Sequence, residues 1–135
     1  MTFEELGLRS EVLKSLTELG FEAPTPIQEK AIPYLMQEDC DFVGLAQTGT
    51  GKTAAFGLPL INNIDTKARL PQGLIICPTR ELCLQITKDL NVFAKYLDCS
   101  ITAVYGGTDI RKQITDIKKG TSIIVATPGR LVDLM

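Results

Sequence analysis

A glycine- and threonine-rich stretch at residues 46–53 offers the clearest chemistry in the sequence. It lies between an apolar run expected to form a strand and a segment expected to form a helix. In this setting, successive backbone N–H groups surround a phosphate. Lys52 would then reach the β- and γ-phosphates, and Thr53 would bind Mg²⁺ through its hydroxyl. The predicted phosphate-binding loop is Ala46, Gln47, Thr48, Gly49, Thr50, Gly51, Lys52 and Thr53, with Ala46 in place of the usual first glycine.

A second candidate segment, residues 20–28, lies upstream and reads Gly-Phe-Glu-Ala-Pro-Thr-Pro-Ile-Gln. Taken alone, it predicts the start of a helix. Thr25 and Gln28 have the spacing of a capping box, and Pro26 fits the first helical position. Phe21 would then be a hydrophobic staple, and the segment would carry no chemistry.

The composition excludes several classes of site. The chain has 135 residues and a net charge of -2, which argues against a broadly basic surface but not against a local basic face. It has no histidine, which excludes Ser-His-Asp triads, Cys-His dyads and His-ligated zinc. None of the four cysteines forms a C-x-x-C pair, and the first residues do not resemble a signal peptide. We therefore expect reduced thiols, a cytoplasmic protein and no membrane association.

Blocks of apolar and amphipathic residues predict strands that alternate with helices. The expected strands are residues 42–46, 74–77, 101–105 and 122–126. The expected helices are residues 10–19, from 26, after 53, 81–96, 109–119 and from 128. This alternation predicts an α/β fold with a parallel sheet flanked by helices.

Local signals predict where several of these helices begin, end or bend. Ser10 is expected to cap the first helix and Gly20 to end it, while Pro33 is expected to break or restart the second. The apolar face of helix 81–96 is expected to comprise Leu82, Ile86, Leu90 and Phe93.

Three further motifs follow in the order found in one known family. They are Pro78-Thr79-Arg80-Glu81-Leu82 with Gln85, Gly106-Gly107, and Thr127-Pro128-Gly129-Arg130. Together with residues 20–28 and 46–53, they resemble the motifs of the DEAD-box family of ATP-dependent RNA helicases. Phe3 resembles the isolated aromatic that precedes the Q motif of that family. The resemblance covers nearly the whole chain and implies a partial RecA-like P-loop domain.

The resemblance implies that residues 20–28 recognise ATP. Phe21 would stack on the adenine, Gln28 would hydrogen-bond the adenine edge, and Thr25 would connect this Q motif to the phosphate loop. Lys52 and Thr53 would be the catalytic residues, with Thr53 as the Mg²⁺ ligand. The implied cofactors are therefore ATP and Mg²⁺.

The resemblance also implies an RNA-binding face that contacts the sugar–phosphate backbone of one strand without reading its bases. The implied residues are Pro78, Thr79, Arg80, Glu81, Gly106, Gly107, Thr127, Pro128, Gly129 and Arg130. The glycines allow close approach of a backbone, and the two arginines supply positive charge. Tyr105, beside Gly106, is expected only to pack at the end of a strand.

Parts of the family's machinery do not occur in this sequence. It contains neither the Asp-Glu-Ala-Asp segment nor the Ser-Ala-Thr motif, and its last residue, Met135, falls within an expected helix. We expect residues 1–37 to form an N-terminal helical segment with the Q motif, and residues 38–135 an incomplete first RecA-like domain. We expect this portion to bind nucleotide weakly without hydrolysing it at a useful rate. We expect its parent protein to have ATPase and helicase activity.

Two alternatives remain open on the sequence. Another P-loop enzyme, such as a kinase, would carry its base-recognition loop and lid after the phosphate loop, whereas residues 20–28 precede it. A natural short form would instead act as a non-catalytic RNA- or partner-binding module. If strands 42–46 and 74–77 lack neighbours, their open edges and apolar faces predict self-association of the chain.

Overall fold

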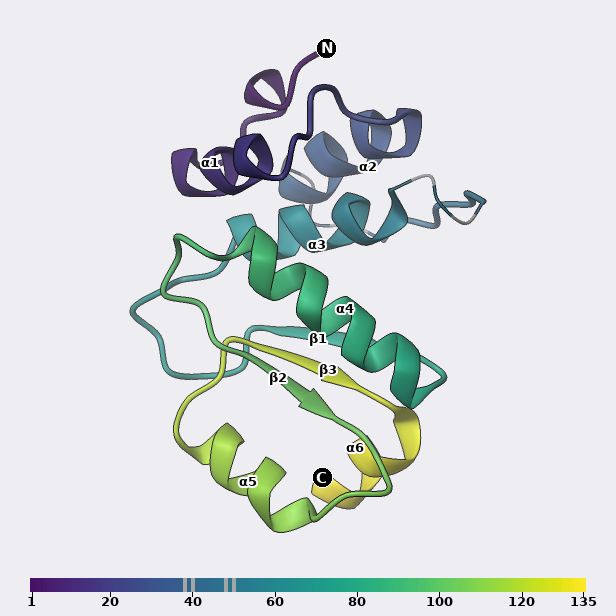
Figure 1. Cartoon of the computed structure of the whole chain (residues 1–135), viewed down its shortest axis with the longest axis vertical. Helices are drawn as coiled ribbons and strands as arrows, with labels where there is room; N and C mark the ends of the chain where they lie inside the picture. The colour runs from purple at the N-terminus through teal and green to yellow at the C-terminus, as the bar shows by residue number, and fades with distance from the viewer. Residues whose placement is uncertain (38, 40, 48, 50) are drawn as a thin grey trace. The chain divides into compact units, whose positions relative to one another are not determined.

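The computed structural model describes residues 1–37, 39, 41–47, 49 and 51–135. It divides the chain into two units, whose elements are labelled in Figure 1. The first unit comprises Met1–Asn63 with Val92–Leu97, and the second comprises Ile64–Asn91 with Asp98–Met135.

The regular structure of the first unit is helical. It contains the 3-10 helix η1 (Glu4–Leu6) and the helices α1 (Ser10–Glu18), α2 (Pro26–Gln37) and α3 (Lys52–Asn62). Helices α2 and α3 pack against each other. Ile32 of α2 and Leu58 and Ile61 of α3 are fully buried, so apolar packing stabilises this pair of helices.

The end of α1 confirms the stop predicted at Gly20. Gly20 has a φ of 80°, in the left-handed region that glycine adopts without strain. Its N–H donates to Thr17 O at 3.1 Å, and the Phe21 N–H donates to Leu16 O at 3.0 Å. These two bonds form a Schellman motif, which fixes the direction in which the chain leaves α1 at Phe21.

Two other helix predictions are wrong. The N-cap of α1 is Arg9, and Ser10 is already helical. The Arg9 N–H donates to Asn62 Oδ1 at 2.7 Å, which fixes the entry into the helix one residue earlier. Pro33 lies inside α2 without ending it. Proline removes one backbone hydrogen bond there, but packing of α2 against α3 keeps the helix continuous.

The second unit contains a parallel sheet whose strands follow the order β1-β3-β2. The strands are β1 (Gly73–Ile76), β2 (Ile101–Val104) and β3 (Ile123–Ala126). In the register of the sheet, Gly73 and Ile101 both lie opposite Ile123. The central strand β3 is the most buried, since Ile123, Val125 and Ala126 have no exposed surface.

Helices cover both faces of this sheet. Helix α4 (Arg80–Phe93) connects β1 to β2, and α5 (Ile110–Lys118) connects β2 back to β3. The two connections cross the sheet in opposite directions, so right-handed crossovers place their helices on opposite faces, as Figure 1 shows. Helix α6 (Pro128–Leu134) follows β3. The predicted α/β fold with a parallel sheet flanked by helices is confirmed.

The apolar face of α4 differs from the prediction at one position. Leu82 is 42% exposed, while Cys83, Ile86 and Leu90 are buried. Positions i, i+3 and i+7 lie on one helix face, and Cys83 rather than Leu82 falls on the stripe that faces the sheet. Its thiol donates to Val125 O at 3.1 Å.

Candidate functional site

The predicted phosphate-binding loop, called the phosphate loop below, ends at the start of α3. Gly49 and Gly51 have φ values of 85° and 84°, and Gly51 is the N-cap of the helix. Lys52 and Thr53 are the first helical residues, with Lys52 exposed and Thr53 half-buried. The free N–H groups of a helix N-terminus attract phosphate, so this geometry suits the predicted role. Thr48 and Thr50, also predicted in this loop, lie outside the described residues.

The strand predicted at residues 42–46 does not form. Residues 41–47 have no regular secondary structure; within them Ala46 is half-buried and Gln47 is exposed. Val43 and Leu45 are 86% and 91% exposed. A strand needs neighbours for its backbone hydrogen bonds, and no strand in the described ranges pairs with this segment. The side chains of Val43 and Leu45 are therefore left in contact with solvent.

Gln28 joins the Q motif to the phosphate loop. Its side chain is buried, and its Oε1 accepts from the Thr25 N–H at 3.0 Å. Its Nε2 donates to Gly51 O at 3.2 Å. The first bond is one half of a capping box, and the second reaches the N-cap of α3. Both ends of the Gln28 amide are thus used within the first unit.

Gly51 and Thr25 complete this contact. A Cβ on residue 51 would overlap Gln28 Nε2, and the positive φ of Gly51 also disfavours a side chain. Such a Cβ would lie 3.2 Å from Thr25 Oγ1, so Thr25 lies beside the loop. Thr25 Oγ1 is buried and accepts or donates no hydrogen bond within the part of the chain that the structure describes. In this structure Gln28 makes the hydrogen bond between the two segments, and Thr25 lies beside it.

Phe21 is held by other aromatic rings. Its ring centroid lies 6.0 Å from those of Phe3 and Phe93, in tilted and edge-to-face arrangements. Phe3 and Phe93 are buried, whereas Phe21 is 37% exposed. The Schellman motif and the two neighbouring rings therefore fix Phe21 while leaving part of its surface accessible.

The predicted RNA-binding residues follow the carboxyl ends of all three strands. Because the strands are parallel, these ends lie at the same edge of the sheet. The Arg80 guanidinium lies 4.9 Å from the centroid of the Tyr105 ring, and a Cβ on Gly107 would lie 3.7 Å from Arg80 Nη1. Residues from the first two loops are thus neighbours, and Tyr105 does more than pack at a strand end. The exposed members of the set are Pro78, Thr79, Arg80, Glu81, Gly106, Gly107, Pro128 and Gly129, while Thr127 and Arg130 are half-buried.

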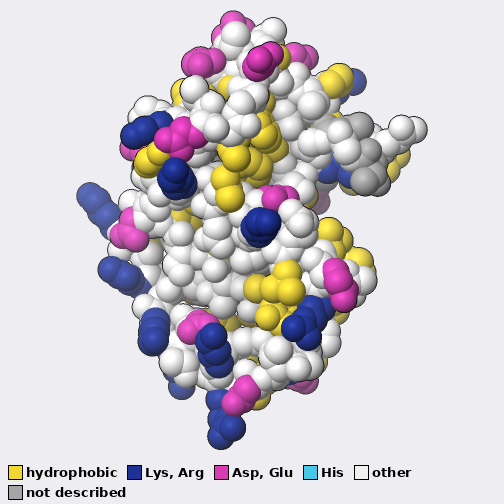
Figure 2. All heavy atoms as spheres, viewed as in Figure 1, with side chains coloured by type: hydrophobic (Ala, Val, Ile, Leu, Met, Phe, Trp, Pro, Cys, Tyr) yellow, Lys and Arg dark blue, Asp and Glu magenta, His cyan; other side chains and the backbone are white. Residues whose placement is uncertain are grey.

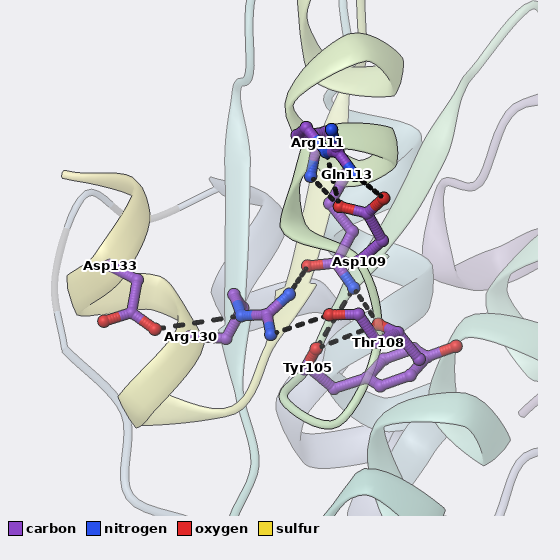
Figure 3. A network of polar contacts seen from close by, with 7 residues as sticks. All are labelled: Tyr105, Thr108, Asp109, Arg111, Gln113, Arg130 and Asp133. Atoms are coloured by element: carbon purple, nitrogen blue, oxygen red, sulfur yellow. Dashed lines mark hydrogen bonds and ion pairs between the residues drawn. The ribbon is translucent and has the colours of Figure 1, made fainter.

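Arg130 differs from Arg80 in that its guanidinium bonds within the protein. Its side chain is only 10% exposed. Its Nη1 donates to Gln113 Oε1 at 2.9 Å and its Nη2 to Thr108 O at 3.0 Å, as Figure 3 shows. Its Nε lies 3.8 Å from Asp133 Oδ2. Arg130 therefore connects α6 to the loop that follows β2.

Gln113 is the residue of this region that sequence reasoning missed. It is 7% exposed and lies on the same face of α5 as Ile110 and Ile117. A polar residue at an apolar position of an amphipathic helix was the available signal, because a buried amide requires partners. Elsewhere α5 is strongly charged, and Figure 2 shows Lys and Arg side chains around it with acidic side chains among them.

The buried thiols next to the first predicted RNA-binding loop serve packing. Cys77 and Cys83 have 3% and 0% exposed surface. Burial, with a contribution from the neighbouring Cys77, raises the pKa of Cys83 to about 11. Cys83 therefore stays protonated near neutral pH and is a poor nucleophile.

Comparison with known proteins establishes the family. The profile of the DEAD/DEAH box helicase family matches residues 25–135. Because this match covers most of the chain, the chain belongs to the DEAD/DEAH box helicase family. This membership decides against the P-loop kinase alternative.

Several similar proteins are bacterial RNA helicases. The ATP-dependent RNA helicase CshA of Listeria monocytogenes is 52% identical over 131 residues, which cover 97% of this chain and 25% of that protein. The ATP-dependent RNA helicase DeaD of Klebsiella pneumoniae is 47% identical over 133 residues, which cover 98% of this chain and 20% of that protein. The chain therefore spans a quarter or less of the length of these relatives.

Solved structures confirm the predicted RecA-like fold. A DEAD box protein from Methanococcus jannaschii is 38% identical with a TM-score of 0.92, over 98% of this chain and 36% of that chain. Dbp5 of S. cerevisiae bound to RNA and ADP BeF3 is 33% identical with a TM-score of 0.89, over 99% of this chain and 34% of that chain. No helix of the described ranges is both long and apolar enough to cross a bilayer.

Proposed function

We propose that this chain is the N-terminal part of an ATP-dependent RNA helicase that binds ATP and contacts the RNA backbone. The observation that carries the proposal is the meeting of three separate motifs at the carboxyl edge of one parallel sheet. Their positive charge and exposed glycines suit a sugar–phosphate backbone. The related Dbp5 structure, which contains RNA and ADP BeF3, supports both ligands.

The nucleotide would bind in the first unit. Lys52 would pair with its phosphates, next to the N–H groups at the start of α3. The exposed part of Phe21 would stack on the adenine, and Gln28 would hydrogen-bond the adenine edge. Gln28 already bonds to Thr25 and Gly51, so we propose that adenine exchanges with at least one of these bonds.

Thr53 would bind Mg²⁺ at this site through its hydroxyl oxygen. An oxygen ligand at the end of a phosphate loop suits Mg²⁺, which also takes phosphate oxygens and water as ligands. No cluster of three or more His, Cys, Asp or Glu side chains in the described ranges offers a competing metal site. Bound Mg²⁺ would neutralise phosphate charge, while Thr53 would orient it and Lys52 would hold the phosphates.

The RNA would lie along the carboxyl edge of the sheet. Arg80 would pair with a phosphate, and Gly106 and Gly107 would let the backbone approach closely. Residues 78–81 and 127–130 would contact the same strand. Such contacts carry no sequence information, so binding would be similar for unrelated single strands.

Hydrolysis and unwinding would belong to the full-length protein that contains this chain. The Asp-Glu-Ala-Asp segment is absent from the printed sequence, and positioning by such groups drives phosphoryl transfer. We propose residues 1–37 as the helical segment with the Q motif and residues 38–135 as part of the first RecA-like domain. Residues 1–135 alone would bind ATP weakly, and the protein would act in the cytoplasm.

The test is the ATPase activity of the full-length protein with and without RNA. We expect ATP turnover that rises on addition of single-stranded RNA, to a similar extent for two unrelated sequences, and little turnover of GTP. ATP turnover that does not change on addition of RNA, or that rises with only one of the two RNA sequences, would refute the proposal.

A further inference from the structure

We propose that Gln113 is a positioning residue for RNA binding, which holds Gly106 and Gly107 together with Arg130 in one fixed arrangement. The proposal rests on the RNA-binding function proposed above. Gln113 lies outside the helicase motifs in the sequence and is buried, so its role is to position other residues.

The contacts of Gln113 connect two of the RNA-binding loops. Its Nε2 donates to Tyr105 O at 3.1 Å and to Thr108 Oγ1 at 3.0 Å. Its Oε1 accepts from Arg130 Nη1 at 2.9 Å. One amide therefore bonds to the loop after β2 and to the motif after β3, as Figure 3 shows.

Arg130 completes the attachment of the loop. Its Nη2 donates to Thr108 O at 3.0 Å, while Gln113 bonds to Tyr105 O at the other end. Gly106 and Gly107 are thus flanked on both sides by residues that are held by hydrogen bonds. Glycine loses more conformational freedom on ordering than any other residue. Fixing these two glycines before RNA arrives reduces the entropy that binding must overcome.

Glutamine suits this position because its amide both donates and accepts. A methionine of similar size offers neither function, and it would leave the Arg130 Nη1–H without its partner in a site with little access to water. A glutamate would keep the acceptor for Arg130 but could not donate to Tyr105 O as a carboxylate. Gln113→Met therefore removes every hydrogen bond of the Gln113 amide. Gln113→Glu removes only the bonds that its N–H groups donate, including the bond to Tyr105 O.

The chain offers a matched control in Gln72. Its Oε1 accepts from the Asp65 N–H at 2.8 Å, and its Nε2 donates to Asp65 O at 3.0 Å. Gln72 therefore also holds a loop with both ends of its amide, but it precedes β1 at the amino edge of the sheet. Gln72→Met removes a comparable pair of bonds away from the RNA-binding residues.

The experiment compares Gln113→Met and Gln72→Met in the full-length protein. RNA-stimulated ATPase gives KM for RNA and kcat, a fluorescent ATP analogue gives the nucleotide Kd, and RNA titrations at several salt concentrations give the salt dependence. For Gln113→Met we expect KM for RNA to rise about tenfold, with kcat and nucleotide Kd unchanged. The slope of log K against log salt should become shallower by about 0.7, as for the loss of one phosphate contact. Gln72→Met should change none of these quantities.

Unchanged RNA affinity in Gln113→Met, or an equal loss of nucleotide and RNA affinity, would overturn the inference. If thermal melting shows that Gln113→Met does not fold, Gln113→Glu replaces it. That variant should also raise KM for RNA, and a wild-type KM and salt slope would overturn the inference. A wild-type protein that does not bind RNA would refute the proposed function itself, and the inference with it.

Discussion

Gln28 and Gln113 hold two glycine-containing loops by the same means. Both side chains are buried on helices, and each donates an amide N–H to a loop carbonyl, Gly51 O and Tyr105 O respectively. The two glutamines differ in the group that donates a hydrogen bond to Oε1. Gln28 Oε1 accepts from the N–H of Thr25, just before its own helix, whereas Gln113 Oε1 accepts from Arg130 of a separate motif.

The two glutamines therefore reach their loops through different contacts. The Gln28 amide reaches the phosphate loop at one carbonyl, that of Gly51. The glycine loop of the second unit is bonded at Tyr105 and at Thr108, by side chains from two elements. We expect the contact between Gln28 and Gly51 to change when nucleotide binds. We expect the glycine loop to present the same backbone with and without RNA.

Lys52→Ala gives the largest expected effect and acts on the first of these loops only. In the full-length protein, we expect ATP turnover to fall by roughly a hundredfold or more, because the phosphate charge loses its fixed partner. RNA binding without nucleotide should stay unchanged. Lys30→Ala, which removes an exposed lysine from α2, is the matched control. Undiminished turnover in Lys52→Ala would refute the phosphate-loop assignment.

Arg130→Ala and Arg80→Ala test whether the second loop is held from within the protein. Arg130→Ala removes the donor to Gln113 Oε1 and to Thr108 O, so we expect the free energy of unfolding to fall by about 1–3 kcal/mol. Arg80 is exposed, and its removal should change that free energy by less than about 0.5 kcal/mol. Urea unfolding measures both values. Equal losses would show that Arg130 is not part of an internal network.

Gln28→Glu tests whether Gln28 recognises adenine or only holds the loop. The carboxylate keeps an acceptor for the Thr25 N–H but cannot donate to Gly51 O or to an adenine ring nitrogen. We expect ATP affinity to fall about tenfold and the preference over GTP to shrink, as measured by nucleotide titration. Gln113→Glu should leave nucleotide choice unchanged. If Gln28→Glu keeps the wild-type ATP affinity and the wild-type preference for ATP over GTP, Gln28 does not recognise adenine. It would then serve only as a helix cap and a contact to the loop.

The smallest expected effect concerns the open edge of the sheet. Leu74 and Ile76 on β1 are 52% and 57% exposed, and β1 pairs on one side only within the described ranges. We propose that isolated residues 1–135 self-associate through this edge. Ile76→Lys should reduce the apparent mass in light scattering, whereas Val132→Lys on α6 should not. A monodisperse wild-type monomer with a sharp thermal transition would contradict this proposal.

Local sequence signals were sufficient where the structure depends on near neighbours. The end of α1 at Gly20 and the start of α2 at Pro26 follow from backbone conformation and capping, and both are confirmed. Pro33 does not break α2, because packing between α2 and α3 outweighs the loss of one hydrogen bond. The strand expected at residues 42–46 failed because a strand also depends on its neighbours.

The candidate site also depends on contacts that local sequence signals do not predict. Motif order placed residues 78–81, 106–107 and 127–130 on one face, and the parallel sheet brings them to one edge. Gln113 and Arg130 are 17 positions apart in the sequence, and no local sequence pattern predicts the hydrogen bond between them. Only the buried position of a polar residue on α5 indicated that Gln113 needed a partner.

The most direct test of a sequence-independent RNA site at this edge is the RNA affinity of Arg80→Ala in the full-length protein. It should be measured on two unrelated single strands at several salt concentrations, with Arg69→Ala as the exposed-arginine control. We predict an equal loss of about tenfold for both strands and a salt slope shallower by about 0.7. Arg69→Ala should behave as wild type. A loss confined to one of the two sequences, or no loss at all, would contradict the account.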